Sequence, residues 1–486
     1  MSTLQALPID GHSSDISSAA FDRGAVVVAP PGTGKSTRVP PALAERSKGR
    51  VVVLQPRRLA ARMLAARVAS ERGSVLGRDV GYEVRHDRKV TAGTRIVYMT
   101  AGLFARKMLA DPELDEIGCV VIDEFHERQI EADLALALCR HLRTRRPSLG
   151  LVVMSATLEP EPIAEYLGGA RVFDIDSRLY PIDVRYMPGN PSWKLEQRVG
   201  AAVRELADSE GSILVFLPGK GEIQRCRDHL QGVAVSAGFE LVALHGGLPA
   251  AEQDRATRGQ SRRIILATNV AETSVTVPGV TAVVDSGLAR VARHSPWTGL
   301  SRLSLEPVSQ ASIEQRAGRA GRLGPGACIR LFEKGDYQSR PVQLPPEVER
   351  AELSSALLFV HGIGKPELRW FEPPRPAAWQ AAGELLERLG FVAGGAITES
   401  GRRALALPTH PRLARIVELG IELGVGASAC VAAAAIDAGP IRTAAAQVGS
   451  ESDVVDEVEL LDERSPRGAG IDGRAVGEAR RLARQL

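Results

Sequence analysis

Apolar residues gather in short runs along the first third of the chain, and the stretches between them carry apolar residues at helical spacing. The runs lie at residues 25–28, 51–54, 96–99, 119–122 and 151–154 and are apolar almost throughout. Such runs are typical of parallel strands whose sheet is covered on both faces. Helical spacing is clear at residues 57–71 and 130–143. The alternation predicts a doubly wound α/β domain.

The same alternation repeats in the middle of the chain. Its expected strands lie at residues 213–217, 241–244, 264–267, 282–284 and 329–332, and residues 176–181 form a plausible linker before them. After about residue 340, prolines punctuate a mostly helical region, and from residue 401 the chain is rich in Ala, Leu and Arg. Two tandem α/β domains followed by helical segments are therefore predicted. The last residues resemble the middle of a helix, so we expect a chain truncated at its C-terminus.

Composition narrows the class of protein without naming a partner. The 486 residues are 44% hydrophobic and 24% charged, and the net charge is only +3, so a nucleic-acid partner would need a locally basic channel. We expect no signal peptide, no membrane span, a cytoplasmic location and a monomer. The cysteines are scattered without metal-ligand spacing, which favours core positions in a reducing compartment: Cys119, Cys139, Cys226, Cys328 and Cys430.

A phosphate-binding loop follows the first expected strand, in the sequence Ala29-Pro30-Pro31-Gly32-Thr33-Gly34-Lys35-Ser36-Thr37. A glycine-bearing loop between a strand and a helix lets backbone N–H groups surround phosphate oxygens. We expect residues 32–37 to bind a nucleotide, with Lys35 on the β- and γ-phosphates and Ser36 on Mg²⁺. Ala29 stands where such loops usually have glycine, and Gly32 and Gly34 supply the backbone freedom. The alternative is a glycine-rich turn with a solvated lysine.

An acidic pair ends the expected strand at residues 119–122, in the sequence Asp123-Glu124-Phe125-His126-Glu127-Arg128. A carboxylate at the carboxyl end of a parallel strand is suited to hold Mg²⁺ near a phosphate loop, which we expect on a neighbouring strand. Asp123 and Glu124 are the expected metal residues, and Glu124 is the expected general base for phosphoanhydride hydrolysis. Alone, such a cluster is more often a solvated helix start.

The chain resembles the DEAH-box helicases of superfamily 2, and among them the bacterial HrpB type. Two motifs described above carry this resemblance, together with five more: Gln55-Pro56-Arg57-Arg58, Thr100-Ala101-Gly102, Ser155-Ala156-Thr157, Thr268-Asn269-Val270-Ala271-Glu272-Thr273-Ser274 and Gln315-Arg316-Ala317-Gly318-Arg319-Ala320-Gly321-Arg322. All occur in the family's order over about two-thirds of the chain. One departure is Phe125, where the family has alanine; it bears on subfamily rather than on activity.

The resemblance implies two RecA-like domains with parallel sheets at residues 1–177 and 178–340, a winged-helix-like segment at 341–400 and a helical bundle at 401–486. It implies that Arg319 and Arg322 act as arginine fingers on the γ-phosphate. Gln315 would orient the attacking water, and the three spacings are compatible with one helix. Arg67 would stack on the base or be an ordinary helix-surface residue. A solvated basic turn is the alternative for the arginine motif.

Other motif residues match positions that contact the sugar-phosphate backbone in the family: Arg57, Arg58, Thr100, Thr268 and Asn269. Helix capping or a core hydrogen bond explains each of them nearly as well. Residues 288–305 resemble the family's strand-separating hairpin, where Trp297 would stack on a base or pack against the C-terminal segments. Ser155 and Thr157 would couple hydrolysis to movement or cap a helix. His126 would link the chemistry of the two lobes by hydrogen bonds.

These features predict an ATP hydrolase and RNA helicase that uses ATP and Mg²⁺ and binds single-stranded nucleic acid. The family alone favours RNA over DNA and movement in the 3′ to 5′ direction. Two alternatives share the same ATP-site residues: a remodeller of ribonucleoprotein complexes that separates no strands, and a catalytically idle nucleic-acid-binding scaffold. The five intact residues of the ATP site speak against the idle scaffold: Lys35, Asp123, Glu124, Arg319 and Arg322.

Overall fold

The chain forms two compact units in the computed structural model, which describes residues 6–85, 87–176, 180–190, 192–259, 261–272, 277–294, 301–322, 324–364, 368–438, 441, 452–462 and 470–486. The first unit comprises Met1–His294, Ser301–Ala351 and Arg369–Glu372, and the second comprises the remaining segments. Among the described residues, no helix combines the length and the apolar character that a membrane crossing requires. The first unit has two lobes, each built on a large sheet, and a two-stranded hairpin.

The first lobe is built on an eight-stranded sheet in the order β4-β3-β5-β2-β6-β7-β1-β8. Only β4 runs antiparallel to its neighbour. The strands are β1 (Ala25–Val28), β2 (Arg50–Gln55), β3 (Val80–Val84), β4 (Asp87–Lys89), β5 (Ile96–Thr100), β6 (Ile117–Ile122), β7 (Gly150–Ser155) and β8 (Arg171–Asp174). The five predicted strands are present, whereas β3, β4 and β8 were not predicted.

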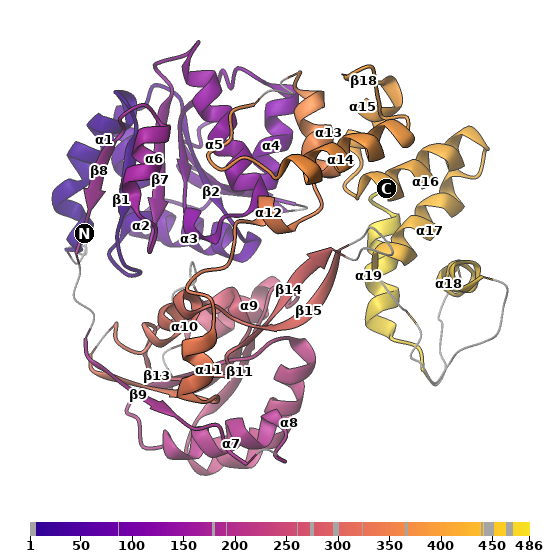
Figure 1. The fold of residues 1–486 in the computed structure, drawn as a ribbon. Helices are drawn as coiled ribbons and strands as arrows, with labels where there is room; N and C mark the ends of the chain where they lie inside the picture. Colours follow the sequence, from indigo (N-terminus) through magenta and orange to yellow (C-terminus); the bar gives the residue numbers. More distant parts are fainter. Residues whose placement is uncertain are drawn as a thin grey trace. The chain divides into compact units, whose positions relative to one another are not determined.

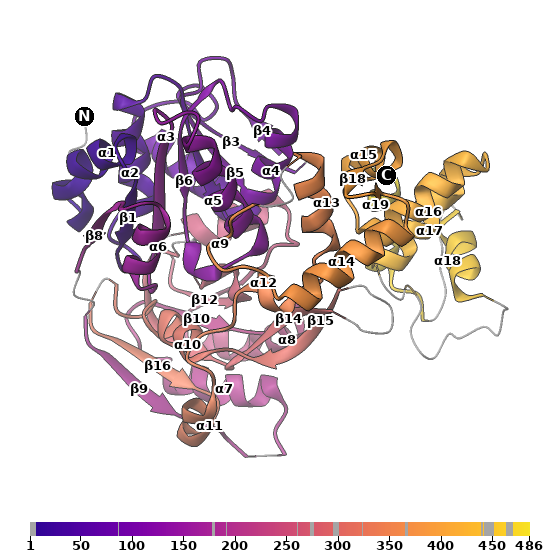
Figure 2. The ribbon, with the colours of Figure 1, turned by 45° about the horizontal axis from the view of Figure 1, so that its top comes forward.

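Helices cover both faces of this sheet, as Figures 1 and 2 show. Alternate side chains such as Val27, Val53 and Val121 pack with α1 (Ser13–Phe21), α2 (Lys35–Arg46) and α3 (Arg58–Glu71). The opposite face carries α4 (Ala101–Ala110), α5 (Ile130–Arg143) and α6 (Pro160–Tyr166). Burial on both faces explains why the strands are apolar at every position rather than at every second one. The first predicted α/β lobe is confirmed.

The second lobe is built on a six-stranded parallel sheet in the order β11-β12-β10-β13-β16-β9. Its strands are β9 (Ile182–Tyr186), β10 (Ser212–Phe216), β11 (Glu240–Leu244), β12 (Arg263–Ala267), β13 (Val280–Asp285) and β16 (Gly326–Arg330). One face packs on α7 (Leu195–Glu205) and α8 (Lys220–Ser236), and the other on α9 (Ala250–Arg258) and α10 (Gln310–Ala317). The second α/β lobe is also confirmed, although β9 was not predicted.

A long antiparallel hairpin leaves the second lobe where the sequence predicted one. Its strands are β14 (Leu288–His294) and β15 (Ser301–Pro307), paired from Leu288 opposite Pro307 to His294 opposite Ser301. Trp297 lies outside the described residues, so its two expected roles stay predictions. Two short helices, α11 (Lys334–Ser339) and α12 (Glu347–Arg350), follow β16.

The second unit is mostly helical. It contains α13 (Ser354–Gly362), α14 (Pro376–Arg388), the two-residue strands β17 (Val392–Ala393) and β18 (Ala396–Ile397), α15 (Glu399–Ala406), α16 (Pro411–Glu422), α17 (Gly426–Ala438), α18 (Asp453–Asp462) and α19 (Gly473–Ala483). His410 ties two of these segments: its Nδ1 accepts the Arg412 N–H at the start of α16, and its Nε2 lies 2.8 Å from Glu352 Oε2. The predicted helical character is confirmed, and the winged-helix likeness stays a prediction.

Candidate active site

The loop between β1 and α2 is shaped by its own backbone. Gly32 and Gly34 adopt φ values of 97° and 95°, which an L side chain rarely tolerates. The Thr33 hydroxyl donates to the Pro30 carbonyl at 2.9 Å, and the buried Lys35 Nζ donates to the Ala29 carbonyl at 3.1 Å. The Ala29 side chain lies in the hydrophobic core of the lobe, which explains why alanine replaces glycine there. Lys35 thus folds back on its own loop.

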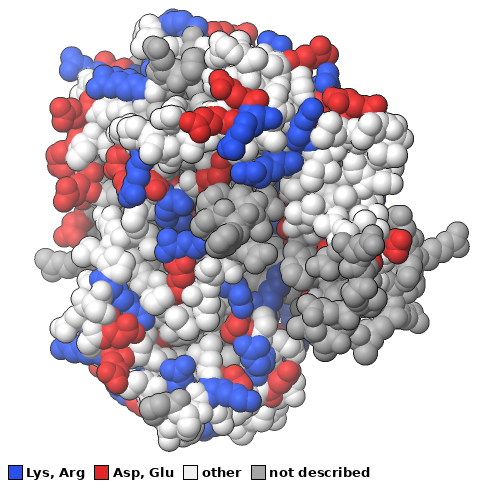
Figure 3. All heavy atoms as spheres, turned by 45° about the vertical axis from the view of Figure 1, so that its right-hand side comes forward, with Lys and Arg blue, Asp and Glu red and all other residues white. Residues whose placement is uncertain are grey.

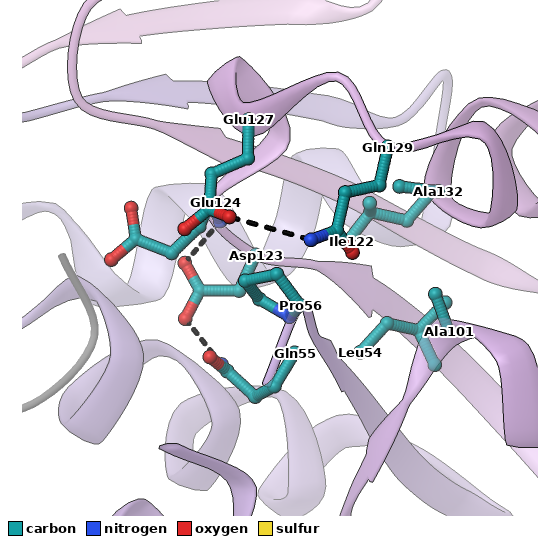
Figure 4. Close-up of a pocket in the computed structure, with 10 residues that line it drawn as sticks. All are labelled: Leu54, Gln55, Pro56, Ala101, Ile122, Asp123, Glu124, Glu127, Gln129 and Ala132. Carbon is teal, nitrogen blue, oxygen red and sulfur yellow. Dashed lines mark hydrogen bonds between the residues drawn. The ribbon is translucent and has the colours of Figure 1, made fainter. Parts of the chain in front are cut away.

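The acidic pair lies at the carboxyl end of β6, with only 3% of Asp123 and 5% of Glu124 exposed. Gln55 at the end of β2 donates from Nε2 to Asp123 Oδ2 at 2.6 Å, as Figure 4 shows. The Glu124 N–H donates to Asp123 Oδ1 at 2.9 Å. Glu124 itself adopts φ 54°, a left-handed conformation that is unusual for glutamate. Hydrogen bonds from Gln55 and from the Glu124 N–H therefore fix the two carboxylate oxygens of Asp123, and the chain turns sharply at Glu124.

One strand separates the phosphate loop from the acidic pair, whereas the sequence analysis placed them on neighbouring strands. In the order β6-β7-β1, the intervening β7 ends at Ser155. The Ser155 carbonyl accepts the Ala29 N–H at 3.1 Å, and its hydroxyl accepts the N–H groups of Thr157 and Leu158 at 3.3 and 3.2 Å. The Ser155 hydroxyl thus caps the turn that follows β7, while its backbone contacts the phosphate loop.

His126 joins the acidic turn, residues 124–128, to the segment after β7. Its Nδ1 accepts the Ala156 N–H at 3.3 Å and lies 3.6 Å from Glu124 Oε2. Both contacts lie within the first lobe, whereas the sequence analysis expected His126 to bridge the lobes. Thr157, predicted to share this coupling, is exposed.

Charge around the acidic pair comes from both lobes. Burial raises the pKa of Asp123, and the neighbouring Glu124 carboxylate raises it further. Burial also acts to raise the pKa of Glu124, but the positive charges of Lys35, His126, Arg319 and Arg322 outweigh it and lower that pKa. Glu124 is therefore held ionised, whereas Asp123 lacks a fully compensating cation.

The arginine-bearing segment of the second lobe is organised by Glu272. Arg316 is 1% exposed and pairs with Glu272 Oε2 and Asp285 Oδ1, both at 2.9 Å. Arg319 is 3% exposed and donates from Nε to the Glu272 carbonyl at 2.9 Å. Burial lowers the pKa of Arg319 well below the usual range and lowers the pKa of the half-buried Arg322 to about 10.

The predicted single helix for the arginine motif is wrong in its extent. The half-buried Gln315 lies on α10, but this helix ends at Ala317, and Arg319 and Arg322 follow in the next turn. Gly321 allows that turn, because a Cβ at this position would lie 2.7 Å from the Tyr180 carbonyl oxygen. Periodicity alone gave no sign of the helix end.

The residues predicted to contact the nucleic-acid backbone lie at strand and helix ends in both lobes. Arg57 bonds to the Asn269 carbonyl of the second lobe and donates to Glu127 Oε2 at 3.2 Å. Arg58 begins α3 and is exposed, and Thr100 ends β5. Thr268 precedes the 3-10 turn Asn269–Ala271. The structure brings Arg57 and Asn269 together and leaves Arg58 facing solvent.

Arg67, the predicted base-stacking residue, lies on α3 with 70% of its side chain exposed and pairs with Glu71. Glu71 in turn lies 3.5 Å from Arg38 of the phosphate-loop helix. Arg67 is thus exposed and connected to α2 through Glu71.

A small pocket lies directly behind the acidic pair, lined by Leu54, Gln55, Pro56, Ala101, Ile122, Asp123, Glu124, Glu127, Gln129 and Ala132. In Figure 4, Glu127 and Gln129 approach each other over it, with Gln129 Nε2 at 3.4 Å from Glu127 Oε2. Gln55 and Glu272 were not predicted as site residues. The position of Gln55 at the end of a buried strand was the available signal, and Glu272 offered only its place inside a motif.

Charges of both signs are interspersed over most of the described surface on the face in Figure 3. This fits a net charge of only +3. Binding of a polyanion would thus depend on local contacts rather than on the overall field.

Comparison with known proteins identifies the family. Residues 12–166 match the profile of DEAD/DEAH box helicases, and residues 197–324 match the helicase conserved C-terminal domain. The chain therefore carries a DEAD/DEAH box helicase domain and a helicase conserved C-terminal domain. The crystal structure of the Escherichia coli DEAH/RHA helicase HrpB superposes with a TM-score of 0.83 at 35% identity, covering 99% of this chain and 60% of that one.

Two curated relatives of this DEAD/DEAH box chain come from E. coli K12. The ATP-dependent RNA helicase HrpB is 40% identical over 80% of this chain and 49% of its own length. The ATP-dependent RNA helicase HrpA is 38% identical over 85% of this chain and 33% of its own length. The resemblance to the HrpB type is confirmed, and the chain spans about half the length of HrpB and a third of HrpA.

Proposed function

We propose that this chain hydrolyses ATP and uses the free energy to move along single-stranded RNA and separate duplexes. One feature carries the proposal: the buried Glu124 follows the carboxyl end of β6, where the positive charges of Lys35 from the first lobe and of Arg319 and Arg322 from the second lower its pKa. An ionised carboxylate beside a phosphate loop is suited to accept a proton from an attacking water. Because its positive neighbours come from both lobes, the chemistry depends on how the lobes meet.

The phosphates would be bound by the backbone N–H groups of residues 32–37, together with the positive end of α2. Lys35 would exchange its Ala29 carbonyl for oxygens of the β- and γ-phosphates. Arg67, exposed on α3, would cover one face of the base. Stacking makes no strong demand for adenine over guanine, so we expect ATP to be preferred only weakly.

The oxygen groups at the site fit Mg²⁺. The Ser36 hydroxyl and the Gln55 amide both stabilise ionised Asp123, which places the three side chains together. Among the described residues, the buried Glu124 Oε2 and Gln55 Oε1 have no hydrogen-bond partner, so both oxygens are available as ligands. Hard oxygen ligands of this kind suit Mg²⁺, which would neutralise phosphate charge when bound. Ser36 and Asp123 would hold it, with Glu124 nearby.

The arginines of the second lobe would stabilise the charge that develops on the γ-phosphate. Arg319 is buried and Arg322 is half-buried, and burial lowers the pKa of both guanidinium groups. A buried cation that the protein compensates incompletely gains most from an incoming anion. Gln315 on α10 would orient the attacking water, as the family resemblance implies.

The track would lie along the strand ends that carry Arg57, Arg58, Thr100, Thr268 and Asn269. RNA is favoured because the curated relatives bear the name RNA helicase. Contacts to phosphate position a strand without reading its sequence, so binding should be sequence-tolerant and sensitive to salt. The bond from Arg57 to the Asn269 carbonyl joins the two lobes and would break when they separate. Movement in the 3′ to 5′ direction follows from the family likeness.

Steady-state ATP hydrolysis tests the proposal in three arms: no nucleic acid, single-stranded RNA and single-stranded DNA. We expect RNA to stimulate turnover, and Glu124→Gln to lower kcat by about 10²–10⁴ because a general base is lost. Equal stimulation by DNA would overturn the preference for RNA. A rate indifferent to both polymers would favour a remodeller that separates no strands. No hydrolysis would favour the idle scaffold.

A further inference from the structure

A four-residue strap of the chain, Arg369–Glu372, packs with the first unit although the residues on either side of it belong to the second. The Phe371 ring lies 6.1 Å from the Phe125 ring and 5.4 Å from the Tyr166 ring, in tilted and edge-on arrangements. The Tyr166 hydroxyl donates to the Arg369 carbonyl at 2.6 Å. The strap thus seats an aromatic ring against the turn that follows β6.

Arg128 fastens the other end of the same turn. Its guanidinium carbon lies 5.3 Å from the Phe125 ring and 4.9 Å from the Phe371 ring, within the range of cation–π attraction. Nη1 donates to Glu372 Oε1 at 2.9 Å, and Nε donates to the fully buried Asp133 at 3.1 Å. Arg128 is only 7% exposed, so these contacts are screened little by water.

The turn so held is strained at both ends. Glu124 and Arg128 have φ values of 54° and 46°, and neither is glycine. Left-handed residues of this kind persist only where the surrounding contacts impose them, and they concentrate at functional sites. The turn between them, Phe125–Glu127, is a single short 3-10 helix with little stability of its own. Contacts from outside the turn must therefore maintain its shape.

The residues of this turn divide into two groups. Glu124 and His126 lie 3.6 Å apart on the site side, where positive charge from both lobes surrounds Glu124. Phe125, which is fully buried, and Arg128 contact the strap. Phe125 is also the position where the sequence departs from its family's alanine, and the Phe371 ring is what the larger side chain meets.

We propose that Phe371 and Glu372 are positioning residues for hydrolysis: by holding Phe125 and Arg128, the strap keeps Glu124 and His126 in the geometry that the reaction needs. The proposal rests on the proposed ATP hydrolysis. Both ends of the strap continue into the second unit.

Phe371→Ala and Glu372→Gln in the full chain test this role. Because misplacement of a catalytic group by about 1 Å can cost about 10²-fold in rate, we expect Phe371→Ala to lower kcat by about 10–100-fold. Glu372→Gln keeps the side-chain volume, and we expect a loss of about threefold to tenfold. The KM for ATP should change by less than about threefold, since the phosphate loop is untouched.

Hydrogen exchange supplies a readout that does not depend on turnover. The N–H groups of Glu127 and Arg128 bond to the carbonyls of Glu124 and Phe125, each at 3.0 Å. We expect Phe371→Ala to speed their exchange at least tenfold while exchange in the phosphate loop stays unchanged. Arg262→Gln is the matched control, because Arg262 stacks at 4.1 Å on Phe239 in the second lobe and its hydrogen bonds there go to the carbonyls of Ala207, Ser209 and Ala237.

The outcomes separate the two proposals. An active wild-type chain whose strap variants keep wild-type kcat and exchange overturns the strap alone. A lower Tm with unchanged kcat would show that the strap only contributes to packing, and this result also overturns its positioning role. If Phe371→Ala fails to fold, Glu372→Gln decides by the same criteria. A wild-type chain that hydrolyses no ATP overturns the proposed function, and the role of the strap with it.

Discussion

The acidic turn after β6 and the arginine turn after α10 bury charge in different ways. In the second lobe, Arg316 meets two carboxylates at 2.9 Å and stacks 5.0 Å above the Phe216 ring. In the first lobe, Glu124 Oε2 is buried and has no hydrogen-bond partner within the described part of the chain, and burial raises the pKa of Asp123. Arg319, three residues after Arg316, resembles Asp123 rather than Arg316, because burial shifts its pKa towards the neutral form.

The difference separates structural charges from those available to a ligand. A buried ion with a complete set of partners stabilises its surroundings and has little to offer an incoming group. A buried ion whose pKa is displaced towards the neutral form costs folding free energy, and binding of an opposite charge recovers that cost. By this criterion Arg316 is structural, whereas Asp123, Arg319 and Arg322 are the candidates for binding nucleotide and metal.

The largest expected effect comes from Arg319→Gln. Loss of a cation that compensates transition-state charge should lower kcat for ATP hydrolysis by about 10³-fold or more. Since burial disfavours the charged form of Arg319, its removal should leave Tm within about 2 °C of the wild type or raise it. Steady-state kinetics and a thermal melt on the same preparation check both parts. A large fall in Tm would place Arg319 with Arg316 and break the comparison.

Arg316→Gln should act through stability. Its removal leaves Glu272 and Asp285 facing each other across a buried site, and breaking a buried pair in this way costs about 3–5 kcal/mol. Urea unfolding followed by circular dichroism would measure the loss. We also expect Arg319 to lose position, because the Glu272 carbonyl that accepts its Nε–H lies on the same segment. A variant as stable as the wild type would show that the pair contributes little.

Much of the first lobe could be predicted because its strands are buried on both faces. Residues 25–28 and 130–143 were predicted with the boundaries that β1 and α5 have. The missed strands lie at sheet edges or carry mixed polarity: β4 reads Asp-Arg-Lys, and β9 is partly exposed. Such strands follow from pairing with a neighbour, which a single segment does not record.

The candidate site, like the fold, contains residues that could be predicted from the sequence and residues that could not. The phosphate loop and the acidic pair could be predicted because their chemistry is local to one strand–turn–helix segment. Gln55 and the strap could not, because their roles arise from contacts between segments 68 and 244 residues apart in the chain. Phe125 illustrates the limit: the sequence showed the departure from alanine, and only the fold showed the Phe371 ring against it.

The smallest expected effect concerns Asp133. It tests whether burial changes the pKa of a carboxylate more than its ion pair with Arg128 does. Burial raises its pKa to about 6 despite Arg128, and the carboxylates of Glu372 and Glu347 add to the rise. A folded-state pKa above the unfolded value of about 3.9 means that protonation favours the fold. The stabilising contribution of protonated Asp133 is fully present below about pH 4 and is lost as the pH rises through about 6.

Asp133→Asn should therefore flatten the dependence of unfolding free energy on pH between about pH 4 and pH 6.5. A shift of roughly two pKa units corresponds to about 2–3 kcal/mol across that range. Urea unfolding of wild type and variant at several pH values gives the difference between the two curves. If the curves stay parallel, the Arg128 guanidinium compensates Asp133 as fully as Glu272 and Asp285 compensate Arg316, and the contrast between the lobes would then rest on Asp123 and Glu124 alone.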